Sequence, residues 1–357
     1  MSARQASHST VFSTGAAAGA GDPIVDVENL NVTFASNRRP VRAVRGVSFA
    51  VRRGETLAIV GESGSGKSTT GLAIMGLLER ANGTAVSGAV HVAQKSGRKC
   101  DVLRLTAREL RKLRGNDVAM IFQEPMSSLN PAYSVGAQIA EAVLLHQRLR
   151  RRDAFATALD LLRKLQIPNP DNCLKSYPHQ LSGGMRQRVM IAIALSCRPN
   201  LFIADEPTTA LDVTVQAQIL ELLKKAQRES GMALLFITHN LGVVSEIADR
   251  ILVMYAGEVV ESGPTASVFG HPRMPYTAAL LRSLPRLGEE RAEGARLAAI
   301  PGGVPSPTAL PSGCCFHPRC LYRRLGRCDT TGPQLEPCGC DHFVRCQEWR
   351  GIAAATK

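Results

Sequence analysis

The feature that most constrains the fold of this 357-residue chain is one glycine-rich segment, Gly61-Glu62-Ser63-Gly64-Ser65-Gly66-Lys67-Ser68-Thr69. It fits the pattern G-x-x-x-x-G-K-[ST] at every fixed position. Residues 56–60 before it form an apolar run typical of a buried strand, and residues 70–78 after it have the pattern of a helix. A loop between a strand and a helix presents unpaired backbone N–H groups, which suit phosphate oxygens. We therefore predict an α/β fold with a phosphate-binding loop; the alternative is a glycine-rich turn without a ligand.

The groups of this loop have separate expected roles. Its backbone N–H groups would surround the β-phosphate of a nucleotide, Lys67 would bridge the β and γ oxygens, and Ser68 would ligate Mg²⁺. The residues expected to contact the nucleotide are Gly61, Ser63, Gly64, Ser65, Gly66, Lys67, Ser68 and Thr69.

Two carboxylates follow a second apolar run. Residues 201–204 have the composition of a buried strand, and Asp205 and Glu206 come directly after them. Carboxylates at the end of a buried strand lose hydration unless a cation lies close. We predict that Asp205 holds Mg²⁺, directly or through water, and that Glu206 is the base for an attacking water. A solvated acidic turn is the alternative.

A third motif, residues 181–188, reads Leu-Ser-Gly-Gly-Met-Arg-Gln-Arg and leads into the apolar run 190–195. The pattern predicts a helix that begins near Ser182. The N–H groups at such a helix start carry positive partial charge, and the glycines allow a ligand to approach the backbone closely. The motif is therefore a candidate phosphate contact; the alternative is an ordinary helix cap.

In this order the motifs resemble the nucleotide-binding subunit of an ATP-binding cassette (ABC) importer, from about residue 23 to about residue 285. The resemblance implies a P-loop ABC nucleotide-binding domain with a parallel RecA-like sheet core. It also implies an antiparallel β subdomain within residues 26–60 and 88–103, and a helical subdomain that carries the signature 181–188, with amphipathic segments at 137–146 and 152–165. Two cassettes would face head to tail, so that Ser182 and Gly184 contact the ATP of the partner.

Four smaller motifs lie where the resemblance expects them. Gln123 resembles the Q-loop glutamine, which contacts Mg²⁺ or water, and Asp212 resembles the D-loop aspartate. His239 resembles the switch histidine, which hydrogen-bonds the γ-phosphate, although a single histidine at a strand end is usually structural. Phe34 lies about where an aromatic residue stacks on adenine; a core strand residue is the alternative.

Charge and hydropathy bear on location. The formal net charge is +13 and the isoelectric point is near 9.6, which suits nucleic acid or anionic lipid, although solvated arginine-rich helix faces explain it equally well. No apolar stretch reaches the length of a membrane-spanning helix. Residues 7–21 are rich in Ser, Ala and Gly and lack the apolar core of a signal peptide. We expect a peripheral protein at the cytoplasmic face of the inner membrane.

Seven of the ten cysteines lie in the last 44 residues. In a cytosolic chain such a group favours metal or redox chemistry over disulfides. The run Phe316-His317-Pro318-Arg319-Cys320, after Pro-rich segments at 271–281 and 300–305, resembles the C-terminal extension of the dipeptide/oligopeptide/nickel branch of ABC importers.

That second resemblance implies an iron–sulfur cluster of the [4Fe–4S] type, which four thiolates can hold. The cysteines that it assigns as ligands are Cys314, Cys320, Cys328 and Cys346. Zinc and free thiols are the alternatives. The spacing between the second and third ligand is one residue longer than expected, and the extra thiols Cys315, Cys338 and Cys340 could substitute.

The resemblance divides the chain into a disordered tail (residues 1–23), the nucleotide-binding domain (24–285) and the extension (286–357). It implies an ATPase that powers peptide import, with a second ATPase subunit, two membrane-spanning permease subunits and an extracytoplasmic substrate-binding protein. The second ATPase would be a related but different chain, or another copy of this one. Import of nickel or another small solute is the alternative.

Two further function classes fit less well. A nucleic-acid ABC ATPase of the excision-repair type carries very large insertions, whereas Lys67 and Ser182 are only 115 positions apart here, so we expect no nucleic-acid partner. A redox or regulatory protein would not need the intact Lys67 and Glu206.

Overall fold

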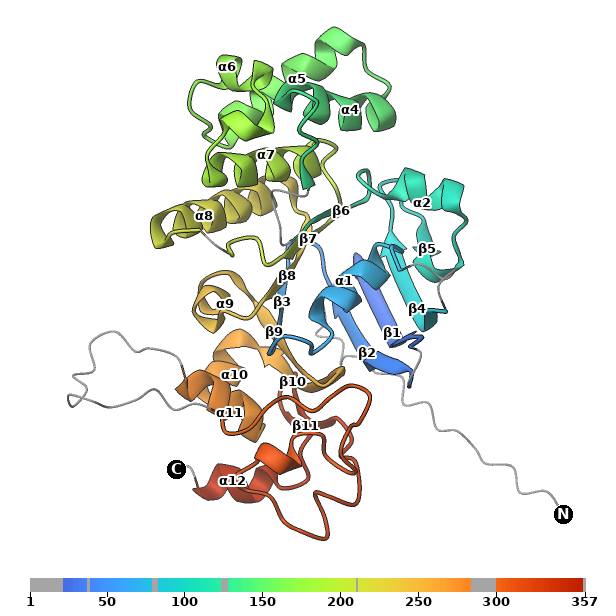
Figure 1. Cartoon of the computed structure of the whole chain (residues 1–357), viewed down its shortest axis with the longest axis vertical. Coiled ribbons are helices and arrows are strands. Elements are labelled where there is room, and N and C mark those ends of the chain that lie inside the picture. The colour runs from blue at the N-terminus through green and yellow to red at the C-terminus, as the bar shows by residue number, and fades with distance from the viewer. Residues whose placement is uncertain are drawn as a thin grey trace, which may run out of the picture.

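The computed structural model describes residues 22–36, 39–78, 83–122, 128–209, 211–283 and 300–355. The chain is elongated, with a group of helices at one end, two β-sheets in the middle and the cysteine-rich segment at the other end (Figure 1). Gln123 and most of the expected N-terminal tail lie outside the described residues.

The larger sheet is the scaffold of the molecule, with strand order β11-β12-β10-β9-β3-β8-β7-β6. The five strands from β9 to β6 run parallel, whereas β10, β12 and β11 continue the sheet with antiparallel pairing. Strands β3, β7 and β8 are buried along their whole length, which explains their continuous apolar sequences. The bounds are β3 Thr56–Val60, β6 Val118–Ile121, β7 Leu201–Asp205, β8 Ala233–Thr238, β9 Arg250–Tyr255, β10 Glu258–Pro264, β11 Glu336–Gly339 and β12 His342–Val344.

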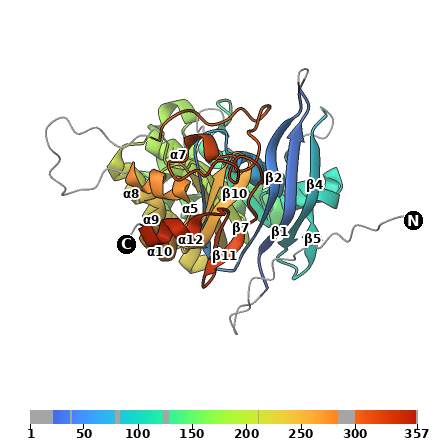
Figure 2. The ribbon, with the colours of Figure 1, turned by 90° about the horizontal axis from the view of Figure 1, so that it is seen from below.

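The smaller sheet is antiparallel, with order β2-β1-β4-β5, and it stands beside the larger sheet (Figure 2). Its strands are β1 Val25–Phe34, β2 Val41–Val51, β4 Ala85–Ala93 and β5 Lys99–Asp101. The expected antiparallel subdomain is confirmed. Residues 56–60 lie instead in the larger sheet, where the strand before the phosphate loop was expected.

Most helices pack around the sheets, and α4, α5, α6 and α7 pack against one another as the helical subdomain at one end of the molecule (Figure 1). Residues 137–146 and 152–165, expected to be helical, lie almost entirely in α4 and α5. The helices are α1 Lys67–Ile74, α2 Ala107–Leu113, α4 Val135–Gln147, α5 Arg151–Lys164, α6 Pro170–Lys175, α7 Gly183–Leu195, α8 Val213–Ser230, α9 Leu241–Ile247, α10 Thr265–Gly270, α11 Pro275–Arg282 and α12 Trp349–Ala355, and the 3₁₀ turns are η1 Val102–Arg104, η2 Pro178–Gln180 and η3 His317–Arg319.

The C-terminal segment is joined to the cassette by a buried carboxylate. Glu261 of β10 is fully buried, and its two oxygens accept the backbone N–H groups of Arg273 and Met274 at 2.6 and 3.1 Å. His342 of β12 lies 2.8 Å from the same carboxylate through Nε2. Because a buried carboxylate needs such partners, this network fixes β12 against β10. The expected boundary at 285/286 falls outside the described residues.

Candidate functional site

The phosphate loop is shaped by two glycines that no other residue can replace. Gly61 has φ +152°, and a Cβ there would lie 2.2 Å from the carbonyl oxygen of Met254. Gly66 caps the N-terminus of α1 with φ +98°, and a Cβ there would lie 2.4 Å from the carbonyl oxygen of Ala43. Both clashes are with backbone, which cannot move aside, so the loop packs tightly against β2 and β9.

Lys67 is buried at the first position of α1 and is held by its own loop. Its Nζ donates to the carbonyl oxygens of Gly61 at 2.8 Å and Glu62 at 3.1 Å. Burial lowers the pKa of Lys67, while the carboxylates of Glu206, Asp205 and Glu62 oppose that shift. An ammonium buried in this way is a ready partner for phosphate oxygens.

The hydroxyl of Ser68 and the carboxylate of Asp205 meet at the C-terminal end of β7. Ser68 Oγ donates to Asp205 Oδ1 at 3.1 Å. Burial raises the pKa of Asp205, and the hydrogen bond from Ser68 partly offsets that shift. Two oxygen ligands this close together suit Mg²⁺, which prefers oxygens and keeps several waters.

Glu206 stands at the next position in a strained conformation. Its φ is +47°, an uncommon value for a residue with a side chain, and its N–H donates to the carbonyl oxygen of Ile237 at 2.8 Å. Oε1 lies 3.0 Å from His239 Nδ1, and Oε2 accepts the hydroxyl of Thr209 at 3.0 Å. Strain of this kind persists only where surrounding contacts hold it, and it is common at active sites.

The environment of Glu206 keeps it ionised. Burial opposes ionisation, but the hydrogen bonds from His239 and Thr209, together with the nearby charges of His239 and Lys67, hold the pKa of Glu206 below its ordinary value. At neutral pH the group is therefore a carboxylate that can accept a proton. The structure thus brings together Lys67, Ser68, Asp205, Glu206 and His239.

The signature motif lies elsewhere, in the helical subdomain. Ser182 caps α7, and its Oγ accepts the N–H of Met185 at 3.4 Å. Ser182 and Gly183 are exposed, and Gly184 is half-buried against Val215. Figure 1 shows α7 within the group of helices at one end of the molecule, next to α4, α5 and α6, whereas α1 lies beside the antiparallel sheet. The helix predicted to begin near Ser182 is present, and Ser182 at its start faces solvent.

Two other residues predicted to contact the nucleotide, Asp212 and Phe34, contact neighbouring parts of the chain in the structure. Asp212 is exposed and caps α8 by accepting the N–H of Val215 at 2.9 Å. Phe34 is half-buried at the end of β1 and packs against the apolar core between the two sheets. Its adenine-stacking role remains a prediction.

Two residues that complete the site, Thr209 and Tyr276, were not expected from the sequence motifs. Thr209 lies three positions after Glu206 and hydrogen-bonds it, which a search for polar neighbours of the carboxylates could have found. Tyr276 of α11 is different, because its hydroxyl accepts the backbone N–H of Glu62 at 2.9 Å across 214 positions. No local pattern predicts such a contact.

Of the seven C-terminal cysteines, four line one small cavity. They are the four that the resemblance assigns, Cys314, Cys320, Cys328 and Cys346, and the cavity holds about 20 Å³. Burial raises the pKa of each of three of these thiols, to about 11 for Cys314 and about 12 for Cys346. Without a positive partner they are neutral thiols at physiological pH.

The backbone near these cysteines partly offsets the effect of burial on the thiols. The backbone group two residues later opposes the raised pKa of Cys314, Cys320 and Cys346. Cys328 accepts a hydrogen bond from the N–H of Arg324 at 3.5 Å. Such bonds favour thiolate over thiol, and they tune sulfurs that ligate iron.

The other thiols differ in their surroundings. Cys338 donates to the carbonyl oxygen of His342, Cys315 lies 3.2 Å from an Arg45 nitrogen, and Cys340 is exposed. Among the described residues, no three His, Cys, Asp or Glu side chains are close enough together to ligate a single metal ion as they stand.

Comparison with known proteins gives two family matches. Residues 44–209 match the ABC transporter family, and residues 260–328 match the family described as oligopeptide/dipeptide transporter, C-terminal region.

No described helix has both the length and the apolar character needed to cross a membrane.

Named relatives match over most of the chain. A protein from Brucella melitensis that is named as a peptide import ATP-binding protein is 51% identical over 335 residues, covering 93% of this chain and 99% of the relative. The oligopeptide transport ATP-binding protein AppD of Bacillus subtilis is 47% identical, covering 90% and 96%. The glutathione import ATP-binding protein GsiA of Escherichia coli is 55% identical over 75% of this chain and 43% of its own length.

A solved structure shares the cassette fold. The ATP-binding cassette MJ0796, a dimer bound to ADP and phosphate, superposes with a TM-score of 0.60 at 28% identity, covering 68% of this chain and 98% of that one.

Proposed function

Because the chain belongs to the ABC transporter family, in the branch with the oligopeptide/dipeptide C-terminal region, we propose that it is the ATPase subunit that powers import of peptides across the cytoplasmic membrane. The observation that carries the proposal is the ionised Glu206, which is held 3.0 Å from His239 beside the Ser68–Asp205 pair.

In this proposal the chain's own groups bind ATP and position water. The N–H groups of the phosphate loop and the ammonium of Lys67 bind the phosphates, after Lys67 leaves its own loop carbonyls. Ser68 and Asp205, with Gln123 as predicted, would hold Mg²⁺, which would neutralise phosphate charge when bound. Glu206 accepts a proton from the attacking water, and His239 orients Glu206 and contacts the γ-phosphate.

The exposed signature supports a site completed by a second cassette. Ser182 and Gly184 lie at the free N-terminus of the 13-residue helix α7, where N–H groups attract anions. We propose that they contact ATP bound to a partner ATPase, which is a related chain or a second copy. The Asp212 side chain, exposed at the start of α8, is proposed to lie at the same junction.

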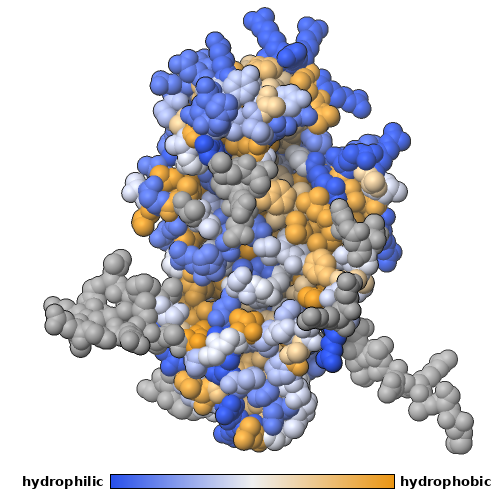
Figure 3. Space-filling model, in the orientation of Figure 1, coloured by the Kyte–Doolittle hydropathy of each residue, from blue (hydrophilic) through white to orange (hydrophobic). Residues whose placement is uncertain are grey.

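A hollow on the surface supports contact with a membrane subunit. A cavity of about 580 Å³ is lined by apolar residues of β6, α7 and the segment after β6, among them Met120, Phe122, Leu129 and Met190. Figure 3 shows apolar surface between the helical subdomain and α2 on this face. We propose that it receives a short helix from a permease subunit, which places the chain at the cytoplasmic face of the membrane. An extracytoplasmic binding protein would deliver the substrate.

We further propose that Cys314, Cys320, Cys328 and Cys346 hold a [4Fe–4S] cluster. Its support is the cavity that all four cysteines line and the ligand set itself, since four thiolates are what such a cluster needs. Zinc is the alternative for the same four cysteines. When bound, the cluster would supply the charge partner that these buried thiolates need, and its role is structural.

The substrate is a peptide of a length that the permease and binding protein select. The 55% identity to a glutathione import protein makes a tripeptide the second candidate within the same class.

Replacement of Glu206 by Gln tests the catalytic proposal. The amide keeps the shape but cannot accept the proton, so turnover by the assembled complex should fall about 10²–10⁴-fold while ATP still binds. Asp160, exposed on α5 and far from the site in sequence, provides the matched control as Asp160→Asn, which should leave turnover unchanged. Equal ATPase rates for Glu206→Gln and the wild type would reject Glu206 as the base.

A further inference from the structure

An arginine of the C-terminal segment reaches into the phosphate loop. Arg319 ends the 3₁₀ turn η3, and its two terminal nitrogens lie 2.7 and 3.0 Å from the two carboxylate oxygens of Glu62. Glu62 is the second residue of the phosphate loop, 257 positions earlier. A two-pronged arginine–carboxylate pair fixes orientation as well as distance.

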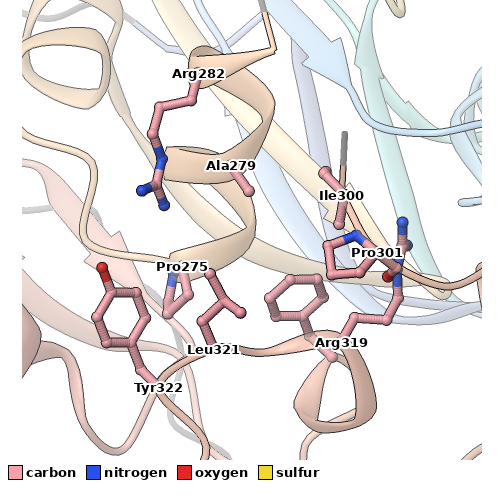
Figure 4. Close-up of a pocket in the computed structure, with 9 residues that line it drawn as sticks. Pro275, Ala279, Arg282, Ile300, Pro301, Arg319, Leu321 and Tyr322 are labelled. Atoms are coloured by element: carbon pink, nitrogen blue, oxygen red, sulfur yellow. The ribbon is translucent and has the colours of Figure 1, made fainter. Parts of the chain in front are cut away.

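The Arg319 side chain is held in place on every side. Nε donates to the carbonyl oxygen of Pro301 at 3.0 Å, and one terminal nitrogen also donates to the Tyr255 hydroxyl at 3.3 Å. The guanidinium lies over two aromatic rings, with its Cζ atom 5.9 Å from the centre of the Tyr255 ring and 6.0 Å from that of Phe316. Figure 4 shows Arg319 beside Pro301 at the edge of a cavity of about 120 Å³. Its side chain is only 5% exposed.

Glu62 is in turn close to the group that binds phosphate. Its carbonyl oxygen accepts the ammonium of Lys67, and its carboxylate is one of three whose charge acts on Lys67. Its backbone N–H is held by the Tyr276 hydroxyl. A carboxylate at this position would repel the phosphates of ATP and compete with them for Lys67 unless another cation held it.

We propose that Arg319 is a positioning residue of the nucleotide site, which binds and neutralises Glu62 so that Lys67 and the loop remain available to ATP. The inference rests on the proposed function, because it concerns the same ATP site. Through Arg319, the C-terminal segment would contribute to nucleotide binding. Since Cys320 follows Arg319 directly, the pair joins the phosphate loop to the segment that carries the cysteine cavity.

The test is a double-mutant cycle on nucleotide affinity. The full chain is titrated with Mg²⁺ and a non-hydrolysable ATP analogue, well below the melting temperature, as wild type, Arg319→Gln, Glu62→Gln and the double variant. Arg319→Gln should weaken binding about 5- to 20-fold, at the low end of typical coupling between sites because Glu62 is partly exposed. Glu62→Gln alone should change it less than about twofold, and the double variant should regain wild-type affinity to within about twofold.

A matched arginine provides the control. Arg324 lies in the same segment and pairs with Glu348 at 3.1 Å, a carboxylate outside the phosphate loop. Arg324→Gln should leave nucleotide affinity unchanged. Arg319→Lys keeps the charge without the two-pronged geometry, so its affinity should fall between those of Arg319→Gln and the wild type, and it serves where Arg319→Gln does not fold.

Two results would overturn the inference. Wild-type affinity in Arg319→Gln, with a lowered melting temperature only, would show that the pair merely fastens the segment. Equal weakness of Arg319→Gln and the double variant would show that Arg319 does not act through Glu62. Failure of the proposed function looks different, because the wild-type chain itself would then not bind ATP.

Discussion

The nucleotide site and the cysteine cavity are built in opposite ways. Lys67, Asp205 and His239 come from segments far apart in sequence. Asp205 and His239 stand at the C-terminal ends of β7 and β8, and Lys67 begins α1 after the loop that follows β3. The sheet fixes their positions before any ligand binds. The four cysteines lie within 33 positions, from Cys314 to Cys346, on turns and irregular segments beside two short strands of four and three residues.

The difference shows what each region needs in order to be ordered. The larger sheet is stabilised by its fully buried apolar strands, and the nucleotide site lies at the ends of these strands. The core therefore orders the site without a ligand. The cysteine segment has little regular structure and buries thiols whose pKa values are raised. Its order should therefore depend on what the thiols bind, whereas the order of the nucleotide site should not.

After Glu206→Gln, the largest effect on turnover is expected at the signature, because its residues are proposed to contact the ATP of the partner. Ser182→Arg places a long cation where the partner's ATP is proposed to lie. Turnover by the assembled complex should fall about 10- to 100-fold, as expected for a residue at the centre of an interface. Affinity of the isolated chain for ATP should not change, which equilibrium titration measures. Loss of ATP binding by the isolated variant would place the signature at the chain's own loop.

A smaller effect on activity, with a visible readout, is expected at the cysteine cavity. Anaerobically purified wild-type chain should be brown and contain about four irons, and Cys320→Ser should contain fewer than about one while the parallel strands remain folded. Cys340→Ser is the matched control, since Cys340 is exposed and does not line the cavity. It should keep its colour and iron. A colourless wild-type chain with about one zinc would replace the cluster by a tetrahedral site.

The smallest expected effect is a shift in pH dependence. Thr209→Val removes one of the hydrogen bonds that hold the pKa of Glu206 below its ordinary value, so that pKa should rise. The base works as carboxylate, and a higher pKa means that it is protonated at a higher pH. The acidic limb of kcat/KM should therefore move toward neutral pH, with the rate on the plateau little changed. An unmoved limb would show that Thr209 does not tune Glu206.

The sequence predicted the cassette well because its motifs are local. The segment 61–69, the carboxylates after β7 and the histidine after β8 are short patterns, and parallel strands bring their ends together by topology alone. The relatives and the structure confirm the fold. The roles of single residues stay predictions, including Phe34, and Gln123 lies outside the described residues.

Contacts across the chain could not be predicted in the same way. The hydroxyl of Tyr276 and the guanidinium of Arg319 reach the phosphate loop from more than 200 positions away, and nothing near either residue in the sequence indicates a partner. The addition of β12 and β11 to the larger sheet was also missed, because strands of three and four residues have no clear periodicity.

The central claim is that this chain converts ATP hydrolysis into peptide import, and transport by the complete complex tests it most directly. The chain would be reconstituted with its partner ATPase, permease and binding protein in proteoliposomes with ATP on the side of the ATPase subunits. We predict that a labelled tripeptide or longer peptide accumulates on that side only with ATP, and that the peptide-loaded binding protein stimulates hydrolysis. Glu206→Gln should lower the rates of hydrolysis and of peptide accumulation about 10²–10⁴-fold. Hydrolysis at one rate with and without peptide, and no accumulation, would contradict the account.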